Sequence, residues 1–212
     1  MYRLYIIVGI IIVSCLLGSI KREINNDQGL LRFLSGEIHH LNNRDEVTIR
    51  GYLENIQDRL GIIDASHFPL YFMKSGKEFT RHFVFQQTYN DVNVFGRYIR
   101  IHMNKNVITS ISSNIENITV NTIPTITQSI ALEILRPNYI EISSYLKYDK
   151  LQIYIKNETP YLVHTIDAIS MESANRYMVD AHTGMVIDIF PLIYEEGPVM
   201  GSGINLLNES VD

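Results

Sequence analysis

The sequence feature that most constrains the fold is residues 81–102, where two runs of β-branched and aromatic residues are separated by Asn90 and Asp91. Two sets of side chains alternate along the first run: Phe83, Phe85 and Gln87, and His82, Val84 and Gln86. A period of two places such sets on opposite faces of a strand. Asn and Asp tolerate left-handed conformations and favour tight turns. This stretch therefore predicts an antiparallel hairpin with one buried face.

An amphipathic helix is predicted upstream of this hairpin. Asp45 is a good N-cap, because its side chain can accept a hydrogen bond from a free backbone N–H of the first turn. The apolar residues that follow it recur at spacings of four, three and four: Ile49, Leu53, Ile56 and Leu60. Gly61 stands where a left-handed C-cap residue belongs. A helix with such a stripe must bury it on the sheet, which predicts an α+β layer.

The second half of the chain repeats this plan after a joint at residues 121–124. Thr127 is the expected N-cap of a helix over residues 128–135. A late strand is expected to end at Asp180, and Gly184 to close the following turn with a positive φ. Other strands are expected over residues 70–72, 107–111, 151–155 and 161–166, with a hairpin loop at 157–160.

These patterns predict an α+β fold of two consecutive modules, each a helix packed on an antiparallel β-sheet, after an N-terminal signal or anchor segment. A chain of 212 residues with 46% hydrophobic residues is large and apolar enough for one or two packed cores. The expected division is a signal peptide or membrane or lipid anchor over 1–20, a polar linker and short helix over 21–44, modules over 45–122 and 123–195, and a flexible tail over 196–212.

The N-terminal segment combines one early positive charge, a long apolar centre and small residues near its end, which is typical of a secretory signal or signal anchor. Residues 12–15 also resemble a loose bacterial lipobox, in which Cys15 would be acylated. The alternative is that Cys15 is an apolar residue removed with the signal. Because Cys15 is the only cysteine, no disulfide is expected in the exported part. The protein is expected outside the cytoplasm, where it is secreted, periplasmic or membrane-anchored.

Residues 86–96, QQTYNDVNVFG, resemble the signature of the FTP domain, the first half of the propeptide of thermolysin-like and fungalysin-like zinc peptidases. The family pattern reads roughly Gln-x-Tyr-x-Gly-x-Pro-Val-x-Gly. The matching residues are Gln87, Tyr89, Val94 and Gly96. The sequence differs at Asp91, where the family prefers Gly, and at Asn93, where it prefers Pro. Both replacements still suit a turn.

A second stretch, residues 176–189, resembles the signature of the PepSY domain, Tyr-x-Val-Asp-Ala-x-Thr-Gly-x-Val. The matching residues are Tyr177, Val179, Asp180, Ala181, Thr183 and Gly184. An FTP domain followed by a PepSY domain is the propeptide arrangement of thermolysin-like peptidases, and the joint resemblance covers about residues 46–195. It implies cystatin-like and PepSY-like modules in which the signature residues have a structural role.

No catalytic residue, metal site or cofactor is expected. A thermolysin-like peptidase needs His-Glu-x-x-His on a helix, and none of the seven histidines begins this motif. His39 and His40 lie near Glu37, but adjacent histidines cannot share one helix face and nothing nearby completes a set of metal ligands. The net charge of −5 and the lack of a Lys/Arg block argue against nucleic-acid binding.

The resemblance implies a non-catalytic propeptide that inhibits a thermolysin-like zinc metallopeptidase and assists its folding. In the family the peptidase is present in cis, and here it is expected in trans. One segment resembles the junction between propeptide and mature enzyme and is the candidate for peptidase contact or processing: Glu196, Gly197, Pro198, Val199 and Met200. Two alternatives stay open. The chain could be the N-terminal fragment of a truncated precursor with no activity of its own, or an envelope-anchored PepSY module that binds another ligand.

Overall fold

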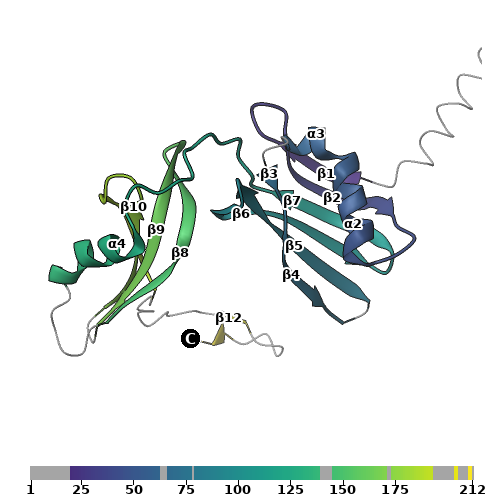
Figure 1. The fold of residues 1–212 in the computed structure, drawn as a ribbon. Coiled ribbons are helices and arrows are strands. Elements are labelled where there is room, and N and C mark those ends of the chain that lie inside the picture. Colours follow the sequence, from purple (N-terminus) through teal and green to yellow (C-terminus); the bar gives the residue numbers. More distant parts are fainter. Residues whose placement is uncertain are drawn as a thin grey trace, which may run out of the picture. The chain divides into compact units, whose positions relative to one another are not determined.

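The structure, a computed structural model, describes residues 20–62, 66–77, 79–138, 145–170, 173–192, 203–204 and 210–211. In these residues the fold is α+β, with many strands and few helices (Figure 1). Contacts divide the chain into two units. The first comprises Met1–Pro124 and Leu151–Val163, and the second comprises Thr125–Lys150 and His164–Asp212.

The first unit contains an antiparallel sheet with the strand order β1-β2-β7-β6-β5-β4. The short β3 pairs with the end of β5. The strands are β1 (Ile20–Asn25), β2 (Leu31–His40), β3 (Ser66–His67), β4 (Leu70–Ser75), β5 (Thr80–Tyr89), β6 (Val92–Asn104) and β7 (Val107–Ser113). The strands expected over residues 70–72 and 107–111 are thus confirmed, and both are longer than predicted.

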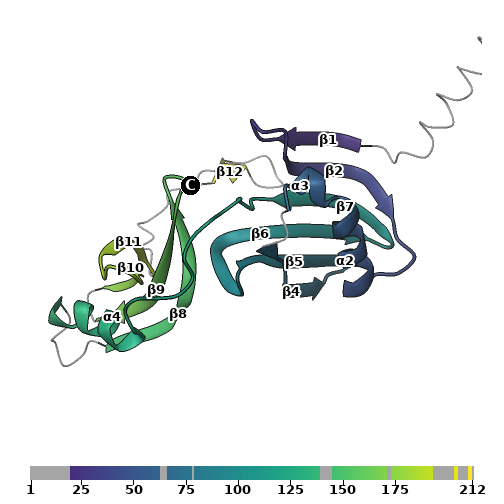
Figure 2. The same ribbon diagram turned by 45° about the horizontal axis from the view of Figure 1, so that its top comes forward.

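Two helices, α2 (Glu46–Asn55) and α3 (Gln57–Leu60), lie on one face of this sheet (Figures 1 and 2). As predicted, Asp45 is the N-cap, and its Oδ1 accepts a hydrogen bond from the Thr48 N–H at 2.8 Å. Gly61 ends α3 in the left-handed conformation, with φ of 71°. The predicted apolar stripe packs into the core of the unit, but Ile56 divides the expected single helix in two.

The predicted hairpin is formed by β5 and β6, and its turn residues Asn90 and Asp91 have φ values of 46° and 62°. Phe83 and Phe85 are fully buried in the core beneath the helices. The alternating neighbours His82 and Val84 are half-buried, as expected for the opposite face of the sheet.

The prediction of a polar linker and short helix over residues 21–44 was wrong, because β1 and β2 occupy this region. Leu31 and Leu34 are both buried in the core although they are three residues apart, a spacing that suggests a helix. The register between β1 and β2 shifts between the pairs Ile24–Phe33 and Asn25–Leu31. Such an irregularity changes which side chains face the core, so the helical spacing here belongs to an irregular strand.

The second unit contains the helix α4 (Gln128–Leu135), which was predicted with these bounds and with Thr127 as N-cap. The remaining strands follow the order β8-β9-β10-β11, and residues 151–163, which include the β8–β9 turn, belong to the first unit. A 3-10 turn, η1 (Arg136–Asn138), follows α4. The strands are β8 (Tyr145–Lys156), β9 (Thr159–Ile169), β10 (Ala174–Asp180) and β11 (Val186–Pro191). Asn157 and Glu158 form the β8–β9 turn, which is shorter than the loop predicted over 157–160.

The core of the second unit lies between α4 and its strands. Ala131 and Leu135 of α4 pack against Ile166 of β9 and Val179 of β10, and Tyr177 is partly buried beside them. Near the end of the chain β12 (Gly203–Ile204) pairs with β13 (Ser210–Val211).

No helix in the described part of the chain is long and apolar enough to cross a membrane. The predicted signal or anchor over residues 1–20 falls almost wholly outside the described residues, as does Cys15.

Candidate functional site

The residues that carry the propeptide resemblance lie in the β5–β6 hairpin, where β6 bulges. Gln86 is paired with Tyr98 and Thr88 with Asn93, so residues 94–97 of β6 stand opposite Gln87 alone. Within this bulge Gly96 has φ of 71°, and Val94 is completely buried. Tyr89 ends β5 and is half-buried. A bulge of this kind interrupts the ladder and leaves backbone groups without strand partners.

Side-chain amides satisfy the carbonyl groups of the bulge. Gln86 Nε2 donates hydrogen bonds to the carbonyl oxygens of Val94 at 2.6 Å and Arg97 at 3.1 Å. Asn114 Nδ2 donates to the carbonyl oxygen of Gly96 at 2.8 Å. A buried carbonyl left unpaired costs about 1–3 kcal/mol, so these amides stabilise the irregular strand. Gln86 and Asn114 were not among the predicted site residues, and the proximity of Gln86 to the signature was the one available signal.

Gln87 makes a paired contact on the other side of the same hairpin. Its Nε2 donates to the carbonyl oxygen of Glu116 at 2.6 Å, and its Oε1 accepts from the Glu116 N–H at 3.1 Å. Gln87 is only 1% exposed. An amide supplies one donor and one acceptor, which matches the two backbone groups that it meets. Gln87 therefore ties β5 to the segment that follows β7.

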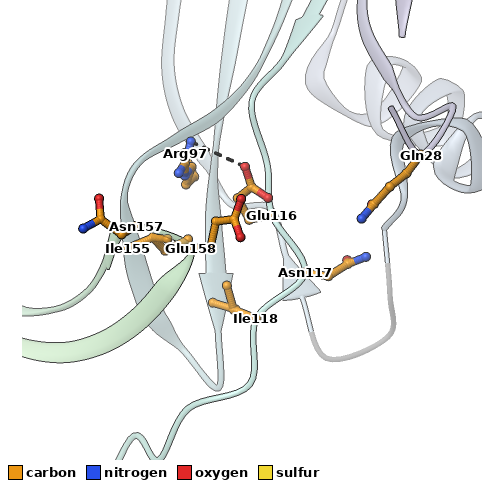
Figure 3. Close-up of a pocket in the computed structure, with 8 residues that line it drawn as sticks. All are labelled: Gln28, Arg97, Glu116, Asn117, Ile118, Ile155, Asn157 and Glu158. Atoms are coloured by element: carbon orange, nitrogen blue, oxygen red, sulfur yellow. Dashed lines mark ion pairs between the residues drawn. The ribbon is translucent and has the colours of Figure 1, made fainter. Parts of the chain in front are cut away.

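A pocket of about 390 Å³ lies beside this contact in the first unit (Figure 3). Its lining residues are Gln28, Arg97, Glu116, Asn117, Ile118, Ile155, Asn157 and Glu158. Arg97 Nη1 lies 3.8 Å from Glu116 Oε1, so the cationic group of this lining is partly neutralised by its neighbour. Amides, carboxylates and one guanidinium can form hydrogen bonds with a polar ligand or a peptide, but they offer no nucleophile with an adjacent base.

The second signature forms the turn between β10 and β11. Asp180 Oδ1 accepts hydrogen bonds from the His182 N–H at 2.8 Å, from the Thr183 N–H at 2.7 Å and from Thr183 Oγ1 at 3.0 Å. The Asp180 backbone N–H donates to the carbonyl oxygen of Met185 at 2.8 Å. Asp180 thus holds the turn together with its side chain and its backbone.

Gly184 and Ala181 connect this turn to the start of the second unit. Gly184 has φ of 79°, and a Cβ atom there would lie 2.6 Å from Ile134 Cδ1 of α4. The Ala181 carbonyl oxygen accepts hydrogen bonds from the N–H groups of Thr125 at 2.9 Å and Ile126 at 3.0 Å. Both residues therefore act through backbone geometry and close packing.

His39 and His164 make structural contacts. The His39 ring stacks on Tyr52 with a centroid distance of 5.0 Å. His164 is 3% exposed, and its Nε2 lies 2.9 Å from the carbonyl oxygen of Ile126, to which it must donate. Its Nδ1 then accepts from the Tyr148 hydroxyl at 3.2 Å, and burial raises the pKa of Tyr148 so that the phenol stays protonated. Across the described residues, no group of three or more His, Cys, Asp or Glu could hold a metal ion.

The predicted peptidase-contacting segment, Glu196 to Met200, and the predicted lipidation site Cys15 lie outside the described residues. The other predicted residues form two clusters: Gln87, Tyr89, Val94 and Gly96 in the first unit, and Tyr177, Val179, Asp180, Ala181, Thr183 and Gly184 in the second.

Comparison with known proteins identifies the first cluster. The family model described as the Fungalysin/Thermolysin Propeptide Motif matches residues 76–115, which include β5, β6 and β7. The chain contains a peptidase propeptide motif. No curated protein sequence matches the chain. Among solved structures, the chain is similar to the Bacillus megaterium YpeB C-terminal domain, with a TM-score of 0.37 and 12% sequence identity over 77% of this chain and 73% of that chain.

Proposed function

We propose that this chain is a non-catalytic propeptide that inhibits a thermolysin-like zinc metallopeptidase, assists its folding and acts outside the cytoplasm. The observation that carries the proposal is the propeptide motif at residues 76–115. The amides of Gln86, Gln87 and Asn114 in this region are all engaged by backbone groups. This use of polar side chains supports a scaffold for binding rather than for catalysis.

We propose further that the two units correspond to a cystatin-like FTP module and a PepSY-like module. The second assignment rests on the signature around Asp180, whose side chain organises the β10–β11 turn, and on the packing of α4 against β9 and β10. The order of the two signatures along the chain is that of thermolysin-like propeptides.

Inhibition of this kind requires an extended segment that occupies the substrate groove without being turned over, together with a folded surface that adds affinity. Residues 190–203 are the natural segment, because they begin at the end of β11 and contain the junction-like residues 196–200. The folded units would then present this segment to the peptidase.

The test is the inhibition of thermolysin, and of a thermolysin-like peptidase from the source organism, by the full-length chain in a mild non-ionic detergent. Hydrolysis of a fluorogenic peptide gives the rate, and electrophoresis shows whether the chain survives intact, which separates an inhibitor from a competing substrate. Deletion of residues 193–212 should abolish inhibition and leave β11 in place. Deletion of residues 205–212 is the matched control, because it keeps residues 196–200, and it should preserve inhibition. A folded, intact chain that slows neither peptidase contradicts the proposal.

The two alternatives give other results. A fragment of a precursor, which the junction-like sequence at residues 196–200 favours, should fold without inhibiting any peptidase. An envelope-anchored module, which the lipobox-like sequence before Cys15 favours, should carry a lipid on its mature N-terminus. Mass spectrometry of that N-terminus detects the modification.

A further inference from the structure

The face of the first sheet that lies opposite α2 and α3 has a charge pattern that the propeptide motif does not explain. Its helix-covered side is fixed by Phe83 and Phe85 of β5 and by Ile99 and Ile101 of β6, all fully buried. Strand alternation then directs the intervening residues to the other side. We call this side the open face and define it by Phe72, Lys74, His82, Arg100, His102 and Ser110.

The open face is basic although the chain as a whole is acidic. Lys74, His82, His102 and Ser110 follow one another across β4, β5, β6 and β7 as register partners. Arg100 lies two residues before His102 on β6, and therefore on the same face. The four strands contain no Asp or Glu, while the whole chain has a net charge of −5.

His82 and His102 form the centre of this row. Their Nδ1 atoms are in contact, and the ring centroids are 4.6 Å apart. The groups around the pair are Lys74 on β4, Arg100 on β6 and the uncharged Ser110 on β7. Burial, and then the nearby His82 and Arg100, hold the pKa of His102 below its usual value.

A metal ion is a poor fit for this pair. Two imidazoles are available, but among the described residues no cluster supplies a third His, Cys, Asp or Glu. The positive charges of Lys74 and Arg100 would also repel a divalent cation. The same charges attract an anion, and an anion placed there would favour protonation of the histidines.

The aromatic side chains on and beside the open face help to decide which kind of anion this surface would bind. The Tyr98 ring already carries the Arg100 guanidinium at 4.9 Å and the Tyr71 ring at 5.6 Å from its centroid. It is therefore not available as a platform on which a nucleic-acid base could stack. Phe72, at 48% exposure on β4, offers an apolar contact beside the charges. Carboxylates interspersed with apolar side chains match this surface better than a phosphate polymer does.

We propose that the open face binds an acidic segment of a partner protein, whose carboxylates contact Lys74, Arg100 and the His82–His102 pair. Binding should strengthen as the pH falls and the pair takes up a proton. The inference rests on the charge and geometry of the first unit, and it does not require the partner to be a peptidase.

The test uses the full-length chain in non-ionic detergent and a fluorescent peptide of alternating Glu and Val, followed by anisotropy at low salt. The double variant Lys74→Gln/Arg100→Gln should bind about tenfold more weakly, because two contacts between opposite charges are lost. The matched control, Lys147→Gln/Lys150→Gln, removes the same charge from exposed positions of β8 and should bind as the wild type does. His82→Gln should remove most of the gain in affinity between pH ~8 and pH ~6. Circular dichroism checks that each variant is folded.

Three outcomes would overturn the proposal. The wild type could fail to bind the peptide even at the lower pH, or both double variants could lose affinity equally, which would indicate only a net-charge effect. Tighter binding of single-stranded DNA than of the peptide would show instead that the face recognises phosphate. No peptidase is present in this assay, so its failure would leave the proposed function untouched.

Discussion

The paired contact between Gln87 and Glu116 gives the sharpest prediction about stability. Gln87→Leu keeps a similar volume but removes the donor at 2.6 Å and the acceptor at 3.1 Å from the Glu116 backbone. Each backbone group left unpaired costs about 1–3 kcal/mol, and the Glu116 groups are only partly buried, so the lower part of this range applies to each. The free energy of unfolding should fall by about 2–4 kcal/mol, which corresponds to roughly 5–12 °C in Tm for a chain of this size.

Urea unfolding followed by far-UV circular dichroism measures this change, because the chain contains no Trp for fluorescence. Hydrogen exchange of the Glu116 amide locates the effect, since this N–H loses its acceptor in the variant. Gln87→Glu is the matched control for the donor. It keeps an acceptor for the Glu116 N–H but places a carboxylate oxygen against the Glu116 carbonyl oxygen.

The pH dependence of Gln87→Glu adds a second check. In the folded state the introduced carboxyl group can replace the lost donor only when it is protonated, so folding raises its pKa above the unfolded value. The stability that it contributes is fully present below the unfolded pKa, about 4.3, and is lost as the pH rises through the folded pKa. If both variants unfold at the wild-type urea concentration at every pH, the contact contributes nothing to stability and the reasoning fails.

Three further predictions concern single residues. Gly184→Ala should destabilise the protein by about 1–3 kcal/mol in thermal unfolding, because a Cβ is strained at φ of 79° and would meet Ile134. The matched variant Gly51→Ala, in the open middle of α2, should instead stabilise the protein by about 0.5–1 kcal/mol in the same assay. Asp180→Ala should cost about 1–3 kcal/mol in urea unfolding, since three hydrogen bonds of the turn lose their acceptor; an unchanged midpoint would refute this role. Folding lowers the pKa of His102, so the stability that His102 contributes is present above the unfolded pKa, about 6.5, and is lost as the pH falls toward the folded pKa. His102→Gln should therefore flatten this part of the curve of stability against pH. A curve as steep as that of the wild type would contradict the prediction.

Much of the fold follows from local signals in the sequence. Asp45 and Thr127 each cap a helix where an apolar period begins, and Gly61 ends one where a positive φ is needed. The Asn90-Asp91 turn fixes the central hairpin, because few residues adopt two consecutive positive φ values. These features depend on a few neighbouring residues, so their physical cause can be read in one stretch of sequence.

The features that the sequence predicted wrongly or did not reveal depend on residues that are distant along the chain. Leu31 and Leu34 face one core because of a register shift, which a single stretch of sequence does not reveal. Asn114 supports the bulge of β6 from the end of β7, so its role appears only after the strands are paired. The basic open face was hidden for the same reason, because the net charge of −5 averages over residues that the sheet separates.

The bulge in β6 explains why the propeptide signature contains the residue types that it does. A regular ladder would pair residues 94–97 one by one with residues of β5, but here all four stand opposite Gln87, and Val94 pairs on its other side with Ile153 of β8. Gly96 supplies the backbone conformation of the bulge, and Gln86 supplies hydrogen-bond donors for two of its carbonyl groups. Gln87 then fixes the following segment at Glu116. Because a slip of one residue in β5 would turn both glutamines and His82 to the wrong face, the bulge also fixes the register on which the open face depends. The signature and the proposed binding surface are therefore two consequences of one backbone irregularity.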